Sequence, residues 1–276
     1  MKISYTNGIE SDDGFLYVAS RNRLYYELGI LSCESLKSYS PKTHVTLFTH
    51  ENFVDDRCKI FDKVITEIPI HYRAKMWCMA RTPYKGRTVY NDCDSLINHR
   101  DVSKIFDQLN DCDIFTGSNA LYTVGDIKWC FIDKERTILP ENHGSLIGYH
   151  GTQLNLDFMQ TWYDEFIKQV TNPWPYSDHY YSDWQQFDMF TLWRLASKRF
   201  DEFSRFFDLR IKILERRWNI TVQDIKTDLP APPVVVQISK TSWSRMEIYK
   251  DIMKGVEDEN HTVKKRPLRD PIIEYN

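Results

Sequence analysis

The sequence lacks the features that mark membrane, secreted and zinc-binding proteins. Its six cysteines are scattered, without a Cys-x-x-Cys pair or the spacing of zinc ligands, which argues against a disulfide framework or a zinc site. No run of about 18 apolar residues is present, so we expect no membrane span. Residues 1–20 lack a basic region followed by a long apolar one, so we expect no signal peptide. These absences predict reduced thiols and a cytoplasmic location.

The sequence also lacks a charge excess, an internal repeat and any low-complexity segment. Its formal net charge is −3, which excludes a general polycation that binds nucleic acid or an anionic membrane. The 276 residues suffice for one large α/β domain or two smaller ones. Aromatic residues make up 14% of the chain, more than a core alone requires, and aromatic faces can bind sugar rings or bases.

Predicted strands and helices alternate over the first ~115 residues. The predicted strands are Lys2–Asn7, Thr43–Thr49, Lys63–Ile70, Thr88–Asp94 and Asp113–Thr116. The predicted helices are Leu16–Tyr39, Tyr72–Ala80 and Val102–Asn110. This alternation favours a Rossmann-like, mostly parallel sheet with helices on both faces. In such sheets ligands bind beyond the carboxyl ends of the strands.

The second half has a more mixed pattern. Strands are predicted at Trp129–Ile132, Gly144–Gly148, Phe207–Leu214 and Pro233–Ile238, and helices at Leu154–Val170 and Trp184–Arg199. A loop of about a dozen residues, rich in proline and tyrosine, joins the two helices, and a loop of that length is often functional. A helix and a charged tail are expected over residues 241–276. The basic stretch Arg194–Arg217 suits either a phosphate-rich acceptor or a solvated face.

Two aspartates follow the apolar run at Thr88–Asn91. In an extended strand Asp92 and Asp94 point to the same side while Cys93 points away. Two carboxylates at a strand end suit Mg²⁺ or Mn²⁺, which prefer hard oxygen ligands. A solvated turn is the alternative for this segment taken alone.

Four segments resemble GT-A-type nucleotide-sugar glycosyltransferases, and most closely the glycogenin- and galactosyltransferase-like retaining group. Residues 72–94 are similar to the helix, turn and strand that lead into the Asp-x-Asp motif of that fold. Asn142–Ile147 resembles its Asn-x-Gly strand, and Asp183–Gln186 stands where an Asp-Gln pair often precedes a helix. Val234–Gln237 resembles a late segment that usually ends in a metal-binding histidine. The similarity covers roughly residues 1–240.

The resemblance implies a glycosyltransferase domain at 1–240, with a nucleotide-binding half at 1–116 and an acceptor half at 117–240. It implies a UDP-sugar donor, retention of the anomeric configuration, and Mn²⁺ or Mg²⁺ held by Asp92, Asp94 and Gln237. The implied donor-binding residues are Tyr5, Thr6, Asn7, Arg73, Lys75, Asp92 and Asp94. The implied acceptor-binding residues are Asn142, Gly144, Trp184 and Gln186.

Asp183 is the predicted catalytic carboxylate near the anomeric carbon, and it also suits the N-cap of the helix that begins at Trp184. His143 and His179 are further candidates. The acceptor is a glycan, a protein or a modified nucleic-acid base, and no oligomeric state is predicted.

Two other functions stay open. In a haloacid-dehalogenase-type phosphotransferase, Asp92 would be the nucleophile. A catalytically inactive binding protein of the same fold would explain Gln185 and Gln237, which replace an expected aspartate and histidine.

Overall fold

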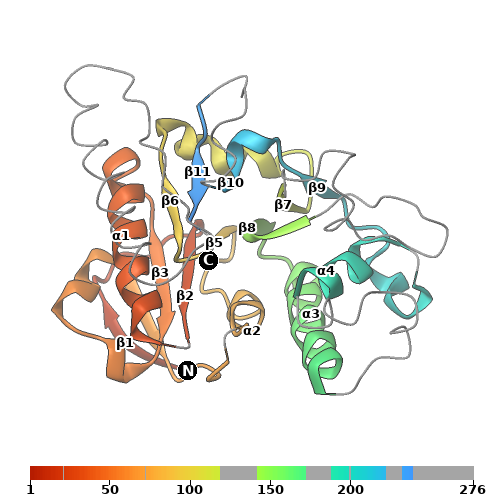
Figure 1. Cartoon of the computed structure of the whole chain (residues 1–276), viewed down its shortest axis with the longest axis horizontal. Coiled ribbons are helices and arrows are strands. Elements are labelled where there is room, and N and C mark those ends of the chain that lie inside the picture. The colour runs from red at the N-terminus through yellow and green to blue at the C-terminus, as the bar shows by residue number, and fades with distance from the viewer. Residues whose placement is uncertain are drawn as a thin grey trace, which may run out of the picture.

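An eight-stranded sheet forms the centre of the molecule (Figure 1). The computed structural model describes residues 1–20, 22–71, 73–118, 142–171, 188–198, 200–221 and 232–238. The strands of the large sheet, in spatial order, are β1 (Lys2–Thr6), β4 (Lys63–Thr66), β3 (Val45–Thr49), β2 (Gly14–Ala19), β5 (Arg87–Asn91), β8 (Asn142–His150), β7 (Ile114–Ser118) and β9 (Ile211–Ile213).

Most of this sheet is parallel. Strands β4, β3, β2 and β5 pair in parallel, and β7 pairs in parallel with β9. Strands β1 and β8 run antiparallel to their neighbours in this sheet. Strand β8 lies between β5 and β7 and pairs with both. The predicted mostly parallel α/β fold is therefore confirmed. Because β8 pairs with β5, the two predicted halves of the domain share one sheet.

Helices cover both faces of the sheet (Figure 1). The α-helices are α1 (Arg23–Tyr39), α2 (Lys75–Met79), α3 (Gln153–Thr171) and α4 (Asp188–Ala196). The 3₁₀ helices are η1 (Glu51–Phe53), η2 (Asp56–Ile60), η3 (Arg100–Leu109), η6 (Asp201–Phe206) and η7 (Arg216–Trp218). Helices α1 and η3 share one apolar core with the sheet, and α2, α3 and α4 share the other.

A second, three-stranded sheet lies beyond the end of β5 (Figure 1). Its strands are β10 (Ile220–Thr221), β11 (Val235–Gln237) and β6 (Ser95–Ile97), in that spatial order. Strand β11 pairs in parallel with β10 and antiparallel with β6. This sheet brings the late segment that ends at Gln237 beside the acidic pair, since Gln237 is opposite Ser95.

The prediction of a helix from Leu16 to Tyr39 is wrong over its first turns. All six residues of β2 are buried, and β2 is a central strand. A strand covered on both faces has a continuous apolar sequence, not an alternating one. Leu16 and Ala19 matched the helical spacing only by coincidence. The helix starts at Arg23, where the Asn22 side chain caps it by accepting the Tyr25 N–H.

This error also misplaced three predicted donor-binding residues. Tyr5, Thr6 and Asn7 were predicted to bind the donor at the end of the first strand, and ligands of such sheets bind beyond the carboxyl ends of the parallel strands. Strand β1 instead runs antiparallel to β4, and Thr6 pairs with Lys63, the first residue of β4. These residues therefore lie at the amino ends of the parallel strands, at the edge of the sheet opposite Asp92. The strand whose carboxyl end reaches the site is β2.

Several other predictions can be compared with the structure. The predicted strands and helices that became β3, β4, β5, β7, β11, α2 and α3 are present within a few residues of their predicted bounds, and the predicted helix at Val102–Asn110 is the 3₁₀ helix η3. The predicted strand at Trp129–Ile132, the loop at 172–183 and the C-terminal helix and tail at 241–276 lie outside the described residues. Within the described part, no helix has both the length and the apolar sequence needed to cross a bilayer. The five cysteines in the described part of the chain form no disulfide and are buried.

Candidate active site

The acidic pair lies at the carboxyl end of β5, as predicted. Asp92 directly follows β5, and Asp94 directly precedes β6. The Asp92 N–H donates to the Ser145 carbonyl at 2.8 Å, and the Ile238 N–H donates to the Asp94 carbonyl at 2.8 Å. The loop that carries the two carboxylates is therefore held by β8 on one side and by the end of β11 on the other.

Cys93 packs the same loop into the apolar core that α1 and η3 share with the sheet. Its thiol donates to the Val18 carbonyl at 3.3 Å. A Cβ at Gly29 of α1 would lie 3.2 Å from its sulfur, so glycine lets the helix approach the loop. Burial, with the nearby Asp92 and Asp94, raises the pKa of the thiol well above its usual value. Cys93 is therefore a neutral packing residue.

Lys75, at the start of α2, is the central cation of the site. Its side chain is only 6% exposed, so it does not lie on a solvated helix face. Its Nζ lies 3.0 Å from Asp188 Oδ2 and 3.8 Å from Asp92 Oδ1, and donates to the Gly144 carbonyl at 2.7 Å. The ammonium group therefore links the acidic loop, β8 and α4.

Gly144 allows Lys75 to occupy this position. A Cβ at residue 144 would lie 3.1 Å from Lys75 Nζ and 3.4 Å from Asp188 Oδ2. The first distance is closer than most side-chain contacts in proteins, so the Lys75 ammonium would have to move by a few tenths of an ångström. Gly144 was predicted as an acceptor-binding residue. The structure places it directly against the central cation of the site.

Asp188 is the functional residue that the sequence did not reveal. It is the first residue of α4, its side chain is 2% exposed, and it forms ion pairs with Arg73 Nη1 at 3.1 Å and Lys75 Nζ at 3.0 Å. Burial alone would raise its pKa, but the two cations outweigh burial and hold the pKa below its usual value. The carboxylate is therefore ionised. An aspartate at the start of an otherwise apolar helix could have indicated a site residue. The same pattern is equally typical of a helix-capping residue.

Tyr90 completes the surroundings of Asp92. Its hydroxyl donates to Asp92 Oδ1, and its ring lies beneath the Lys75 ammonium, 5.6 Å from the ring centre. Burial and the neighbouring Asp92 raise the pKa of the phenol well above its usual value. The phenol therefore stays protonated and donates to the carboxylate.

The third predicted metal ligand, Gln237, does reach the acidic pair. Its amide Nε2 lies 3.5 Å from Asp92 Oδ2. The oxygen and nitrogen of an amide are assigned from their surroundings, and a flip would bring Oε1 to the same place. Two ligands of one ion with bonds of about 2.1 Å lie roughly 3 Å apart, so this separation suits two neighbouring ligands. Asp92 and Gln237 thus fit two neighbouring oxygen ligands of one divalent cation. Within the described residues no three histidine, cysteine, aspartate or glutamate side chains form such a cluster.

Several predicted site residues cannot be placed. Asp183, Trp184 and Gln186 lie outside the described residues, directly before α4 in the sequence. Asn142 is the first residue of β8, and its side chain is not described.

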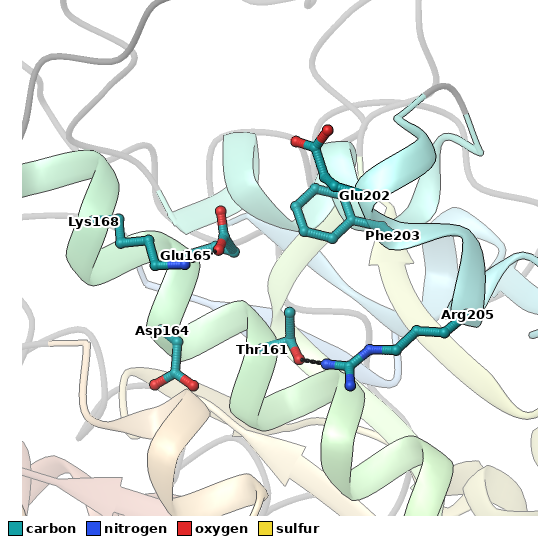
Figure 2. A pocket seen from close by; sticks show the side chains of 7 residues that line it. All are labelled: Thr161, Asp164, Glu165, Lys168, Glu202, Phe203 and Arg205. Atoms are coloured by element: carbon teal, nitrogen blue, oxygen red, sulfur yellow. Dashed lines mark hydrogen bonds and ion pairs between the residues drawn. The ribbon is translucent and has the colours of Figure 1, made fainter.

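A separate cleft of about 470 Å³ lies between α3 and η6 (Figure 2). The residues that line it are Thr161, Asp164, Glu165, Lys168, Glu202, Phe203 and Arg205. Beneath it, the buried Arg194 pairs with Glu165 at 3.3 Å and with Glu202 at 2.7 Å. Arg194 is therefore a buried structural cation, so it neither attracts an acceptor nor lies on a solvated face. The Glu202 carboxylate of the cleft is half exposed, at 50%, whereas the Asp188 carboxylate at the strand ends is 2% exposed.

No model of a known protein family matches the sequence, and no curated protein matches it. Several solved structures do match the chain in fold. The galactosyltransferase LgtC, in complex with donor and acceptor sugar analogues, has 12% identity and a TM-score of 0.55 over 92% of this chain and 98% of its own. The glycosyltransferase GlyE of Streptococcus pneumoniae TIGR4 has 12% identity and a TM-score of 0.57 over 91% of this chain and 63% of its own.

The bifunctional glycosyltransferase WbbM, at 11% identity and a TM-score of 0.50, is matched over 91% of this chain and 50% of its own. The chain thus spans almost all of LgtC, but only about two thirds of GlyE and half of WbbM. These likenesses show that the chain has the GT-A-type fold of glycosyltransferases.

Proposed function

We propose that this chain is a glycosyltransferase that moves a sugar from a nucleotide-sugar donor, with UDP as the nucleotide, to an acceptor. The observation that supports this most is the convergence of Lys75, Asp92 and Asp188 beyond the carboxyl ends of parallel strands. Ligands of open α/β sheets bind there. The glycosyltransferase fold of the similar structures supports the same reaction class.

Transfer breaks the bond between the anomeric carbon and the diphosphate, so negative charge grows on the leaving group. The buried Lys75 ammonium, 3.8 Å from Asp92, offers a fixed positive charge on that side of the site. Asp188 and the Gly144 carbonyl hold this ammonium in place, so little reorganisation is needed when the charge develops. A divalent ion held by Asp92, Asp94 and Gln237 would supply further stabilisation of the diphosphate.

We assign the nucleoside side of the donor to the end of β2. This replaces Tyr5, Thr6 and Asn7, which lie at the other edge of the sheet. Strand β2 ends at Ala19 and pairs directly with β5, so its end is three strands nearer to the acidic loop than the edge strand β1. Arg73, which pairs with Asp188, remains a candidate for contact with the donor.

The remaining roles are proposals from the resemblance. Asp183 would stabilise the positive charge that grows on the sugar, and the reaction would retain the anomeric configuration. Asn142, Gly144, Trp184 and Gln186 would bind the acceptor, which is a glycan, a protein or a modified nucleic-acid base. Mn²⁺ or Mg²⁺ would be the metal.

Nucleotide release from a panel of UDP-, GDP- and ADP-sugars tests the proposal. We expect release from a UDP-sugar with Mn²⁺ or Mg²⁺, lowered at least about 100-fold by Asp92→Asn. Asp111, which lies shortly before β7, has an exposed carboxylate that pairs with Lys212. Asp111→Asn is therefore the matched control. The control should keep full activity.

The other outcomes separate the alternatives. Binding of UDP without release from any donor would indicate a binding protein. Phosphate release from a phosphomonoester would indicate a phosphotransferase. An inverted product, seen by NMR, would overturn retention.

A further inference from the structure

Tyr90 lies two residues before the first aspartate of the acidic pair. It is the fourth residue of β5, with Leu16 of β2 opposite it on one side and Ile147 of β8 on the other. Only 2% of Tyr90 is exposed. Residues two apart in an extended chain point to the same side, so the Tyr90 side chain lies on the same side of the sheet as Asp92. Tyr90 is therefore a firmly packed neighbour of the Asp92 carboxylate.

One oxygen of the Asp92 carboxylate faces two groups of the protein. The Tyr90 hydroxyl donates to Oδ1, and the Lys75 ammonium lies 3.8 Å from the same oxygen. Lys75 is itself held in place, because it pairs with Asp188 at 3.0 Å and donates to the Gly144 carbonyl at 2.7 Å. Oδ1 is thus the oxygen that faces the positive groups of the protein.

The other oxygen of Asp92 faces the small sheet. Oδ2 lies 3.5 Å from the amide of Gln237, the last residue of β11. A divalent cation bound to Oδ1 would lie beside the Lys75 ammonium, and like charges repel at that range. A cation bound to Oδ2 would lie on the side of Gln237. Oδ2 is therefore the oxygen of Asp92 that suits a cation.

The Tyr90 hydroxyl decides which oxygen faces which partner. The last torsion of an aspartate side chain is broad, so a carboxylate without a fixed donor can present either oxygen, or both, to one cation. The Tyr90 ring is fixed by the strand and lies 5.6 Å from Lys75 Nζ, measured from the ring centre. Its hydroxyl therefore has a fixed position from which it holds Oδ1. Donors that orient a metal ligand in this way typically change metal affinity about 10- to 100-fold.

We propose that Tyr90 is a positioning residue that makes Asp92 bind the cation through Oδ2 alone, and that it thereby favours Mn²⁺ and Mg²⁺ over Ca²⁺. Mg²⁺ demands a nearly regular octahedron of ligands, whereas Ca²⁺ accepts a flexible arrangement and can take both oxygens of one carboxylate. A carboxylate with one oxygen held by the protein suits the smaller ions. The inference rests on the metal site of the proposed function.

Cation binding to the full chain tests the inference without a sugar donor. EPR of free Mn²⁺ gives the Mn²⁺ affinity, and displacement of Mn²⁺ by Mg²⁺ or Ca²⁺ gives the other two. The wild type should bind Mn²⁺ at least about 10-fold more tightly than Ca²⁺. Tyr90→Phe, which removes only the hydroxyl, should lower Mn²⁺ and Mg²⁺ affinity about 10-fold and Ca²⁺ affinity less than about twofold.

Tyr149→Phe is the matched control. It removes the same atom from another buried tyrosine of the sheet, whose hydroxyl donates to the Met79 carbonyl at 2.7 Å. This variant should leave all three affinities unchanged. A merely structural loss at residue 90 would lower the three affinities by the same factor, so the ratio of Mn²⁺ to Ca²⁺ affinity is the decisive readout.

Three results would overturn the inference: a wild type that binds Ca²⁺ as tightly as Mn²⁺, an equal loss for both ions in Tyr90→Phe, or the same change of ratio in Tyr149→Phe. The first result needs no variant, so it decides the question even if circular dichroism shows that Tyr90→Phe is unfolded.

The inference and the proposed function can fail separately. A wild type that binds no Mn²⁺ overturns the inference, and nucleotide release from a UDP-sugar in EDTA then shows that transfer proceeds without the metal site. If the expected cation preference is found but no donor releases its nucleotide, the inference stands and the proposed function fails.

Discussion

Two groups of charged residues lie at opposite ends of α4. They contain ion pairs that differ in how much of each side chain is exposed to solvent. The strand-end group comprises Arg73, Lys75, Asp92 and Asp188. The α3–η6 cleft group comprises Glu165 and Glu202, which line the cleft (Figure 2), and the buried Arg194, which pairs with both. Asp188 opens α4, and Arg194 comes six residues later, about 9 Å along the helix axis. The same short helix therefore serves both groups.

The difference lies in solvent access to the partners. At the strand ends both members of the Lys75–Asp188 pair are buried, with 6% and 2% of their side chains exposed. In the cleft the buried Arg194 pairs with Glu202, whose side chain is 50% exposed. Water can screen the cleft pair and replace its exposed partner, but it cannot do so for Lys75 and Asp188. Proteins seldom keep a fully buried pair for stability alone, which points to a functional use of the strand-end group.

The largest effect is expected where both partners are buried. Asp188→Asn leaves Lys75 and Arg73 without their shared counter-charge, so the free energy of unfolding should fall by about 3–5 kcal/mol. Nucleotide release should be lost as well, because Lys75 is no longer held beside Asp92. Urea unfolding and the donor panel measure the two effects. A loss of stability below about 1 kcal/mol would show that the pair is not a buried ion pair in solution.

A pH effect of intermediate size is expected from His143 of β8. Burial lowers its pKa to about 4 in the folded protein, and the pKa is about 6.5 in the unfolded chain. Between these values the unfolded chain binds the extra proton, so stability falls as the pH falls from 6.5 to 4, and is unaffected above 6.5. From pH 7 to pH 5 the loss should be about 2 kcal/mol.

Urea unfolding at both pH values checks this expectation, with His143→Gln as the matched variant. The carboxylates titrate in both proteins, so the difference between their pH slopes belongs to His143. Equal slopes would mean that the folded-state pKa is close to the ordinary value.

A smaller effect is expected from exchanging the third metal ligand. Gln237→His replaces an amide oxygen with an imidazole nitrogen, which should raise affinity for Zn²⁺ and Co²⁺ on the order of 10-fold and change Mg²⁺ affinity little. In Mn²⁺ EPR of the variant, a ¹⁴N coupling should appear that is absent from the wild type. If Gln237→Leu binds Mn²⁺ as tightly as the wild type, Gln237 is not a ligand.

The parts of this structure that could be predicted from sequence are those with a local signature. The acidic pair was placed correctly because β5 ends in an apolar run followed by two spaced carboxylates. Strand β2 was missed because burial on both faces removes the alternation that marks a strand, although Asn22 offered a start signal for α1.

Asp188 was missed for a different reason. Its role depends on Lys75, which is distant in sequence, and on Gly144, which makes room for both. A buried pair between distant residues has no local pattern.

The smallest effect is expected in the α3–η6 cleft. Glu202→Gln removes a half-exposed carboxylate from Arg194, but Glu165 remains as a partner at 3.3 Å. The free energy of unfolding should fall by less than about 1 kcal/mol, and nucleotide release should not change. Glu202→Gln and Asp188→Asn both change a carboxylate to an amide. The two variants can therefore be compared directly under the same conditions. If Glu202→Gln lowered nucleotide release as much as Asp188→Asn does, then partner burial would not separate the two groups, and the cleft would belong to the active site.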